Sequence, residues 1–195
     1  MPGSQPAPGV FGAFDQVSTA ALGAAVLHDV LALPAQDQRM SNWCWAAAAA
    51  DVANFYAPGP LPIDQCVFVR AVYAEVDCAH LPGYDACVNY NTPQDIAGAL
   101  KARHHLNEPP LMRALKFDEI VVEIGHNRPV CAWMNTYEGH YVVIHGYQCG
   151  PGVQDVFIAD PDAAKKFDGQ HSYAELTGGA KPYWAATYLT QLKDP

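Results

Sequence analysis

The sequence predicts an α+β protein with two lobes, in which helices come first and an antiparallel sheet follows. Two observations support this prediction. Residues 43–127 contain segments of helical composition with helix-start signals, whereas the chain after Pro129 consists of short β-branched and aromatic runs separated by turns. A chain of 195 residues, 50% of them hydrophobic, falls in the size range of one domain and can bury a sizeable core.

The first elements lead to a cysteine. A short apolar run at 30–34, VLALP, is expected to form a strand that its proline ends. Residues 43–56 are rich in alanine, lack glycine and proline, and precede APGP, a pattern typical of a buried helix with a sharp stop. Ser41 or Asn42 is the expected N-cap, so Cys44 would lie in the first turn.

Three more helices are expected before the sheet. Residues 62–76 place apolar side chains at roughly helical spacing. Residues 92–105 are expected to begin with Thr92 as the cap and Pro93 in the first helical position. The third of these expected helices covers residues 117–127, FDEIVVEIGHN, and would end near its glycine.

The expected sheet follows from apolar, β-branched and aromatic runs. Turn-forming sequences, TYEG and CGPG, divide the first three runs, which favours antiparallel neighbours. The runs lie at 129–135, 140–148, 155–160 and 183–192.

Charge argues against two kinds of partner. The formal net charge is −9, and the longest cationic cluster is Lys165-Lys166, so neither nucleic acid nor an anionic membrane is an expected partner. No apolar run approaches the roughly 18 residues of a membrane span, so membrane insertion is not expected. Because Arg39 is the first Lys or Arg, a secretory signal is not expected. We expect residues 1–27 to be a flexible tail and residues 28–195 to be the domain.

The cysteines lack the paired C-x-x-C spacing of zinc sites, so neither a metal nor a cofactor is expected. Cys78 and Cys87 flank a Pro-Gly turn and could approach each other, although a disulfide would also require an oxidising compartment. Disulfide pairing stays open among the cysteines outside the candidate site, which are Cys66, Cys78, Cys87, Cys131 and Cys149.

Four residues suggest nucleophilic catalysis. A thiol becomes a nucleophile at a helix N-terminus beside an imidazolium, and Cys44 meets the first condition from local sequence. His140 follows a glycine turn at the entry to an apolar strand, and Asp160 closes the next strand, where it could hydrogen-bond the far ring nitrogen. Gln38, six residues before the cysteine, could form an oxyanion hole with the backbone N–H of Cys44.

Other histidines compete less well for the role of base. His145 lies five residues after His140, and an odd offset in a strand turns it to the opposite face, so a structural role is expected. The remaining candidates lie in polar loops or at helix ends and are expected to be solvated: His104, His105, His126 and His171.

This order of residues resembles papain-like cysteine peptidases, whose sites contain Gln, Cys, His and then Asn or Asp: here Gln38, Cys44, His140 and Asp160. The segments NWCWAA, GHYVVIHGY and IADP are similar to the compact bacterial branch, which includes leader peptidases of bacteriocin exporters and papain-like effector proteases. The resemblance covers roughly residues 30–190. It implies a helical lobe with the cysteine, a sheet lobe with the histidine and aspartate, and a cleft between them.

The resemblance implies a cysteine peptidase that hydrolyses a protein or peptide substrate through a thioester acyl-enzyme. It suggests a bacterial effector or toxin that is secreted or delivered without a cleavable signal, and an immunity or activating protein as a partner. Two alternatives stay open. The same thioester could serve a deamidase, transglutaminase or other acyltransferase, or the chain could be a non-catalytic binding protein on a peptidase scaffold.

Overall fold

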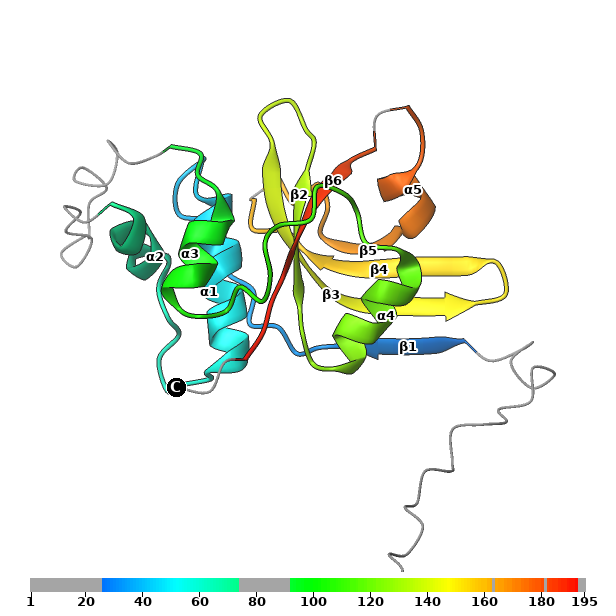
Figure 1. The fold of residues 1–195 in the computed structure, drawn as a ribbon, viewed down its shortest axis with the longest axis horizontal. Coiled ribbons are helices and arrows are strands. Elements are labelled where there is room, and N and C mark those ends of the chain that lie inside the picture. Colours follow the sequence, from blue (N-terminus) through cyan, green and yellow to red (C-terminus); the bar gives the residue numbers. More distant parts are fainter. Residues whose placement is uncertain (1–25, 74–91, 163, 181, 193–195) are drawn as a thin grey trace, which may run out of the picture.

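The computed structural model describes residues 26–73, 92–162, 164–180 and 182–192. Within these ranges the chain forms one antiparallel sheet of six strands, with helices packed against both faces (Figure 1). The helices are α1 (Cys44–Tyr56), α2 (Gln65–Val72), α3 (Ile96–Ala102), α4 (Phe117–Gly125) and α5 (Tyr173–Thr177). The strands are β1 (Leu27–Val30), β2 (Val130–Met134), β3 (His140–Gly150), β4 (Val153–Ala159), β5 (Gly169–Ser172) and β6 (Trp184–Leu189).

The architecture confirms the predicted α+β class. Helices α1, α2 and α3 gather beside the sheet as a helical lobe, whereas α4 covers the other sheet face (Figure 1). The predicted helices at 43–56 and 117–127 and the four predicted strand runs are all present, with ends shifted by a few residues.

The alanine-rich helix α1 is the centre of the helical lobe. Its residues from Cys44 to Asn54 are all buried, and the small side chains let α2, α3 and β3 pack closely around it. The expected cap is wrong, because the N-cap residue is Trp43, whose own side chain makes no capping hydrogen bond. The backbone explains the difference: Trp43 N–H donates to Met40 O in a turn, and Trp43 O accepts from the first helical turn.

The long strand β3 organises the sheet. Its first half pairs with β2 and its second half with β1, while β4 follows the opposite edge. The strand order is β5-β4-β3-β2-β6, with β1 beside the far half of β3. The first residue of β3 therefore lies directly after the turn that joins β2 to β3 (Figure 1).

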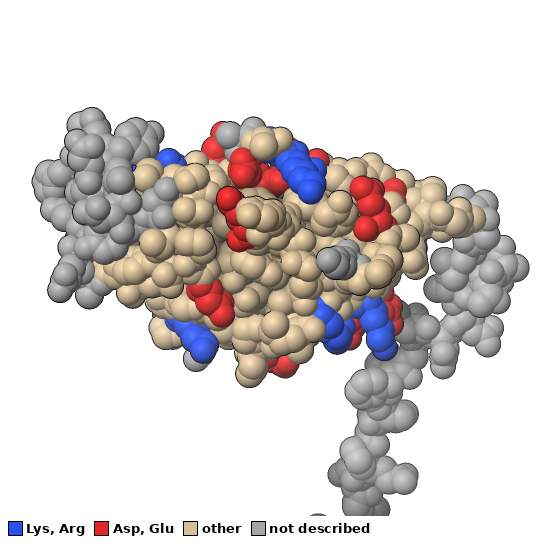
Figure 2. Space-filling view, turned by 90° about the horizontal axis from the view of Figure 1, so that it is seen from above, with Lys and Arg blue, Asp and Glu red and all other residues tan. Residues whose placement is uncertain are grey.

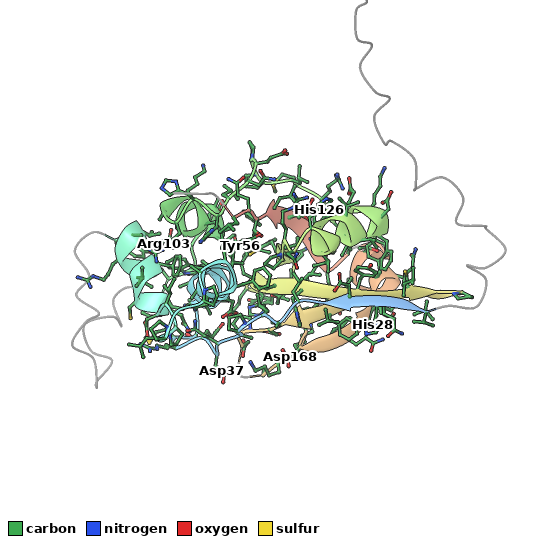
Figure 3. All side chains as sticks on the ribbon, turned by 90° about the horizontal axis from the view of Figure 1, so that it is seen from below. His28, Asp37, Tyr56, Arg103, His126 and Asp168 are labelled. Carbon is green, nitrogen blue, oxygen red and sulfur yellow. The ribbon has the colours of Figure 1, made fainter. Side chains whose placement is uncertain are left out.

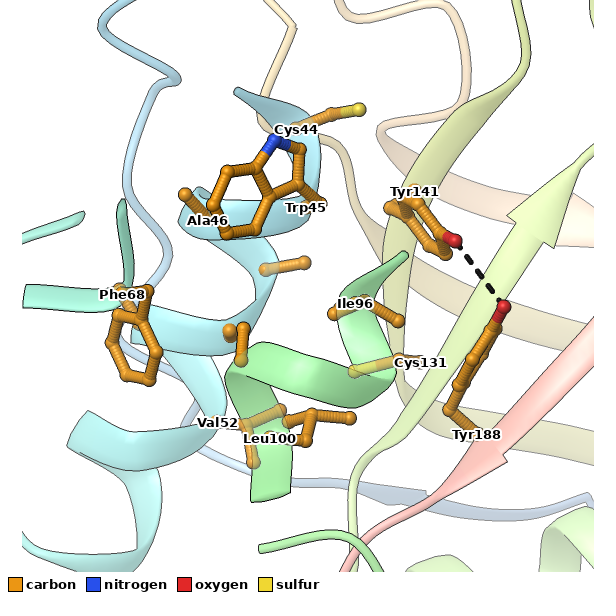
Figure 4. Close-up of a cluster of buried hydrophobic side chains, with 14 of the residues drawn as sticks. Cys44, Trp45, Ala46, Val52, Phe68, Ile96, Leu100, Cys131, Tyr141 and Tyr188 are labelled. Carbon is orange, nitrogen blue, oxygen red and sulfur yellow. Dashed lines mark hydrogen bonds between the residues drawn. The ribbon is translucent and has the colours of Figure 1, made fainter. Parts of the chain in front are cut away.

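Alternation along the strands fills two separate cores. Cys131 and Tyr141 face the helical lobe and pack in the cluster of Figure 4, where the Tyr141 hydroxyl lies 3.2 Å from that of Tyr188. The neighbouring residues Ala132 and Val142 face the opposite side and pack in the cluster that contains α4. Strand β2 and the first half of β3 are thus buried on both faces of the sheet.

The predicted strand at 30–34 is wrong in position. The strand is β1, which ends at Val30, where its partner on β3 is Gly146. Leu31 N–H still donates to His145 O at 2.8 Å, after which the chain leaves the sheet. Pro34 lacks the N–H that a continuing ladder would need.

The helix predicted at 92–105 begins later than expected. Asp95, not Thr92, caps α3, because its Oδ1 accepts from Ala97 N–H at 2.8 Å. Thr92 instead presents its carbonyl to the indole N–H of Trp45, at 3.2 Å. The chain before Asp95 is therefore an extended segment held against α1.

Some expectations fall outside the described residues, namely the Cys78–Cys87 loop and residues 1–25 of the expected tail. The helix predicted at 62–76 is observed as the shorter α2 within the described part of that range. Among the described cysteines, Cys44, Cys131 and Cys149 are free thiols.

Charged side chains do not gather in one place on the face shown in Figure 2. The face shown in Figure 2 is mostly uncharged, with acidic and basic side chains in scattered groups and no continuous basic stripe. Within the described residues, no helix combines the length and apolar character that crossing a bilayer requires.

Candidate active site

The cysteine and the histidine meet where α1 packs against the sheet. Cys44 is the first residue of α1, and His140 is the first residue of β3. Both residues line one cleft, and the interaction of the Cys44 thiol with the imidazole raises the pKa of His140. Figure 4 shows Cys44 at the end of α1, with its sulfur pointing away from the buried cluster. The helical lobe and the sheet thus each supply one member of the pair.

Asp160 follows β4 and lies on the other side of the imidazole. His140 Nε2 is 2.6 Å from Asp160 Oδ1, which leaves Nδ1 as the ring nitrogen for Cys44. The Asp160 side chain is fully buried. Its Oδ1 also accepts from Asp162 N–H at 2.8 Å, and its Oδ2 accepts from Phe167 N–H at 2.9 Å. The carboxylate is therefore fixed from both oxygens.

These contacts set the charge of the imidazole. Burial lowers the pKa of His140, but the hydrogen bonds and charges of Asp160 and Cys44 outweigh it and raise the pKa to about 9. Burial raises the pKa of Asp160, yet the hydrogen bonds from His140 and two backbone N–H groups bring it below its usual value. A protonated imidazole beside an ionised carboxylate is thus favoured at neutral pH.

Gln38 lies next to this group but is turned aside. Its backbone N–H donates to Pro161 O at 2.7 Å, directly after Asp160. Its Nε2 donates to Ser41 O at 2.8 Å, and its buried Oε1 has no hydrogen-bond partner. Gln38 is not among the residues that line the cleft, and its amide bonds the loop before Cys44 instead.

A cleft of about 380 Å³ opens onto the three residues. Pro93, Gln94 and Trp45 form its wall on the helical side, and Trp133 with Tyr137 contributes aromatic surface from the sheet side. The charged side chains that line it, apart from His140 and Asp160, are Glu138, Asp162 and Lys166.

The turn before His140 depends on glycine. Gly139 has φ +72°, a conformation that side chains disfavour. A Cβ at Gly139 would lie 2.0 Å from two ring atoms of Trp133. The indole therefore packs directly on this backbone and fixes the start of β3.

Two residues that sequence reasoning missed support the triad. The Phe167 ring stacks on His140, with ring centroids 6.5 Å apart. Lys165 Nζ donates to Asp160 O at 2.7 Å and to Asp37 Oδ1 at 2.5 Å, which joins the sheet lobe to the segment before α1. Figure 3 places Asp37 and Asp168 on the same edge of the molecule. The Asp-Pro-Asp sequence at 160–162 was a turn signal that could have indicated this loop.

The other histidines lie elsewhere. His145 Nδ1 is 3.0 Å from Leu31 O, in agreement with the expected structural role. The expectation that His105 is solvated is wrong, because it is buried, stacks on Tyr56 and lies 3.1 Å from Gln191 O, and burial lowers its pKa. His104 and His126 are exposed as expected, whereas His171 is half-buried, with its Nε2 atom fully buried.

No group of three or more His, Cys, Asp or Glu side chains among the described residues is arranged to hold a metal ion. The candidate site provides a thiol, an imidazole and a carboxylate, which lie next to one another in that order. This series at the junction of a helix and an antiparallel sheet defines the papain-like class of cysteine peptidases.

Comparison with protein families gives the particular family. The model of the Peptidase_C39 like family matches residues 30–190, and the chain belongs to this family. The match confirms the resemblance to papain-like cysteine peptidases and indicates a cysteine peptidase. No curated protein matches the chain.

Proposed function

We propose that this protein hydrolyses peptide bonds in a protein or peptide substrate, with Cys44 as nucleophile, His140 as acid and base, and Asp160 as the residue that orients the imidazole. One observation supports this most directly. Cys44, His140 and Asp160 line one cleft, and the imidazole interacts with both the thiol and the carboxylate.

In the first step, the Cys44 sulfur attacks the scissile carbonyl carbon as thiolate, and a carbon–sulfur bond forms while the carbonyl oxygen becomes an oxyanion. The imidazolium of His140 favours the thiolate, and its Nδ1 proton passes to the leaving nitrogen as the C–N bond breaks. Asp160 stabilises the charged ring throughout.

The oxyanion requires hydrogen-bond donors. The backbone N–H of Cys44 lies in the first turn of α1, where N–H groups have no partner within the helix. Gln38 Nε2 would be the second donor. Because Gln38 Oε1 has no partner, rotating the amide toward the cleft gives up only the bond to Ser41 O.

In the second step, neutral His140 removes a proton from water, and the hydroxide attacks the thioester carbon. The carbon–sulfur bond then breaks, which releases the new carboxyl terminus and restores the thiolate–imidazolium pair. Asp160 again holds the ring with Nδ1 toward the reacting atoms.

Labelling with iodoacetamide at about pH 6 and pH 8 tests the nucleophile, with the modified cysteine mapped by peptide mass spectrometry. We expect fast labelling of Cys44 at both values, because His140 stays protonated below about pH 9, and slow labelling in His140→Ala. Buried Cys131 is the internal control. Slow labelling of several cysteines, indifferent to His140, would contradict the proposal.

Mass spectrometry of a peptide library separates hydrolysis from the alternative acyl transfers. Hydrolysis produces new termini, whereas deamidation leaves each chain whole and changes its mass by about one unit. Cys44→Ala must abolish the change. Intact peptides joined to amines, or deamidated peptides, would replace the peptidase with a transferase or deamidase.

A further inference from the structure

Gln65 is a buried polar residue that the proposed chemistry does not use. It is the first residue of α2 and is 1% exposed. Asp64 caps this helix by accepting from Cys66 N–H at 2.9 Å and also forms an ion pair with Arg39. The start of α2 is therefore held against the segment that precedes α1.

The Gln65 amide makes two hydrogen bonds to that segment. Its Nε2 donates to Asp37 O at 2.7 Å, and its Oε1 accepts from Arg39 N–H at 3.0 Å. These two backbone groups lie on either side of Gln38. One side chain thus supplies the donor and the acceptor that a neighbouring strand would supply, and both ends of the amide are used.

A third contact completes the restraint of Gln38. Its own N–H donates to Pro161 O in the loop that carries Asp160. The backbone of residues 37–39 is therefore fixed from the helical lobe by Gln65 and from the sheet lobe by Pro161. The Gln38 side chain is held only by the bond from its Nε2 to Ser41 O, since its Oε1 has no hydrogen-bond partner.

We propose that Gln65 is a positioning residue, which holds Gln38 so that its amide can reach the oxyanion formed on the substrate of Cys44. This inference rests on the function proposed above, in which Gln38 is an oxyanion donor. Gln65 touches neither the substrate nor the reacting atoms, and it acts through the backbone on both sides of Gln38.

The chain offers a matched control in Asn54. Its side chain also makes two backbone hydrogen bonds, one from Ile63 N–H at 2.5 Å and one to Ile63 O at 3.0 Å. Asn54 is 4% exposed, and both of these hydrogen bonds are with Ile63 and not with residues 37–39. Asn54→Ala therefore removes an equally buried amide without releasing Gln38.

The experiment compares two reactions of the same thiol in the full chain. Acetylation by p-nitrophenyl acetate passes through a tetrahedral oxyanion, whereas alkylation by iodoacetamide does not. Both adducts on Cys44 are identified by mass spectrometry. Each rate is measured for the wild type and for Gln65→Ala, Gln65→Glu and Asn54→Ala, after circular dichroism has established the folded state.

We expect Gln65→Ala to acetylate about 10-fold to 100-fold more slowly, while alkylation changes by less than about twofold. Gln65→Glu keeps the acceptor for Arg39 N–H and is expected to lie between Gln65→Ala and the wild type. Asn54→Ala is expected to slow neither reaction selectively. If Gln65→Ala does not fold, the comparison is made with Gln65→Glu.

A double-mutant cycle with Gln38→Ala identifies the route of the effect. Because Gln65 acts through Gln38, the double variant is expected to acetylate no more slowly than Gln38→Ala alone. Additive losses, or equal slowing of both reactions, would overturn the positioning role. A wild type that alkylates at Cys44 but never acetylates would overturn the proposed function itself, and the inference with it.

Discussion

His140 Nε2 lies 2.6 Å from Asp160 Oδ1, so the imidazole is fixed with its other nitrogen toward Cys44. The relationship depends on backbone as much as on side chains. Asp162 N–H and Phe167 N–H hold the carboxylate from the far side. Asp160, which directly follows β4, thus orients the imidazole of His140 at the start of the neighbouring strand β3.

Asp160→Asn is expected to lower the pKa of His140 from about 9 toward its ordinary value, because the strongest group that raises it loses its charge. One pKa unit corresponds to about a tenfold change in the protonated-to-neutral ratio. Acetylation of Cys44 at about pH 8 should therefore fall by at least about tenfold. NMR titration of the imidazole measures the shift directly.

The control for this variant is Asp168→Asn. Asp168 Oδ1 accepts from Asp160 N–H at 3.1 Å, whereas the carboxylate bonded to the imidazole is that of Asp160. An unchanged titration of His140 in Asp160→Asn, or an equal change in Asp168→Asn, would show that the carboxylate does not set the charge of the imidazole.

Gly139→Ala is expected to lower both stability and activity. The backbone conformation costs about 1–2 kcal/mol for a residue with a side chain, and the clash with Trp133 adds about 1–3 kcal/mol. Thermal unfolding measures the first effect and the alkylation rate of Cys44 measures the displacement of His140.

Gly152→Ala is the control that shows the effect of backbone strain without a clash. Gly152 has φ +74°, but no atom lies within 4 Å of a new Cβ. It should lose about 1–2 kcal/mol and keep the alkylation rate of the wild type. Equal losses of activity in the two variants would mean that the Trp133 contact does not position the active site.

Asp51→Asn is expected to stabilise the protein at alkaline pH. Asp51 is buried in α1, where desolvation outweighs the hydrogen bond from Gln36 N–H and raises its pKa from 3.8 to about 8. Between these values the unfolded chain has lost a proton that the folded chain keeps, so stability falls as pH rises. The asparagine variant removes this loss.

At about pH 8, Asp51→Asn should therefore gain at least about 1 kcal/mol, or about 2–4 °C in melting temperature, relative to the wild type. The gain should disappear at about pH 3, where Asp51 is protonated in the folded state and largely so in the unfolded state. A variant that is less stable than the wild type at every pH would contradict this account of Asp51.

Lys165→Gln is expected to change stability little. Lys165 Nζ bonds Asp37, whose side chain is 73% exposed, so solvent and salt screen the pair. We expect a loss of no more than about 1 kcal/mol, which shrinks as salt is added. A double-mutant cycle with Asp37→Asn, followed by thermal unfolding, measures the coupling, and a salt-independent loss above 2 kcal/mol would contradict the expectation.

The sequence indicated the elements whose signals are local. The alanine run identified α1, and the β-branched run after Gly139 identified β3. Caps were harder to predict, because the choice between Thr92 and Asp95 depends on Trp45, which holds the Thr92 carbonyl from a distant helix. The short β5 and α5 were missed, since β5 is the four-residue sequence GQHS, which pairs with β4 but carries no apolar pattern of its own.

In the candidate site, too, residues with local sequence signals were predicted, whereas features that depend on distant contacts were not. Cys44, His140 and Asp160 were singled out from motifs and order, and their catalytic roles stay predictions. His105 was expected in solvent, yet Tyr56 and the end of β6 bury it, which no local pattern encodes. Gln65 gave no signal in the sequence, because its importance depends on a contact across 28 residues.

The run of alanines in α1 affects how the results of single substitutions should be interpreted. Residues 46–50 are fully buried on every side of the helix, so none of them has room for a larger side chain. A survey of all single substitutions should find these positions as intolerant as the nucleophile itself, although they perform no chemistry. Intolerance to substitution would therefore identify the buried residues that hold the thiol in place as well as the thiol itself. Only a measurement of the reaction would distinguish the two.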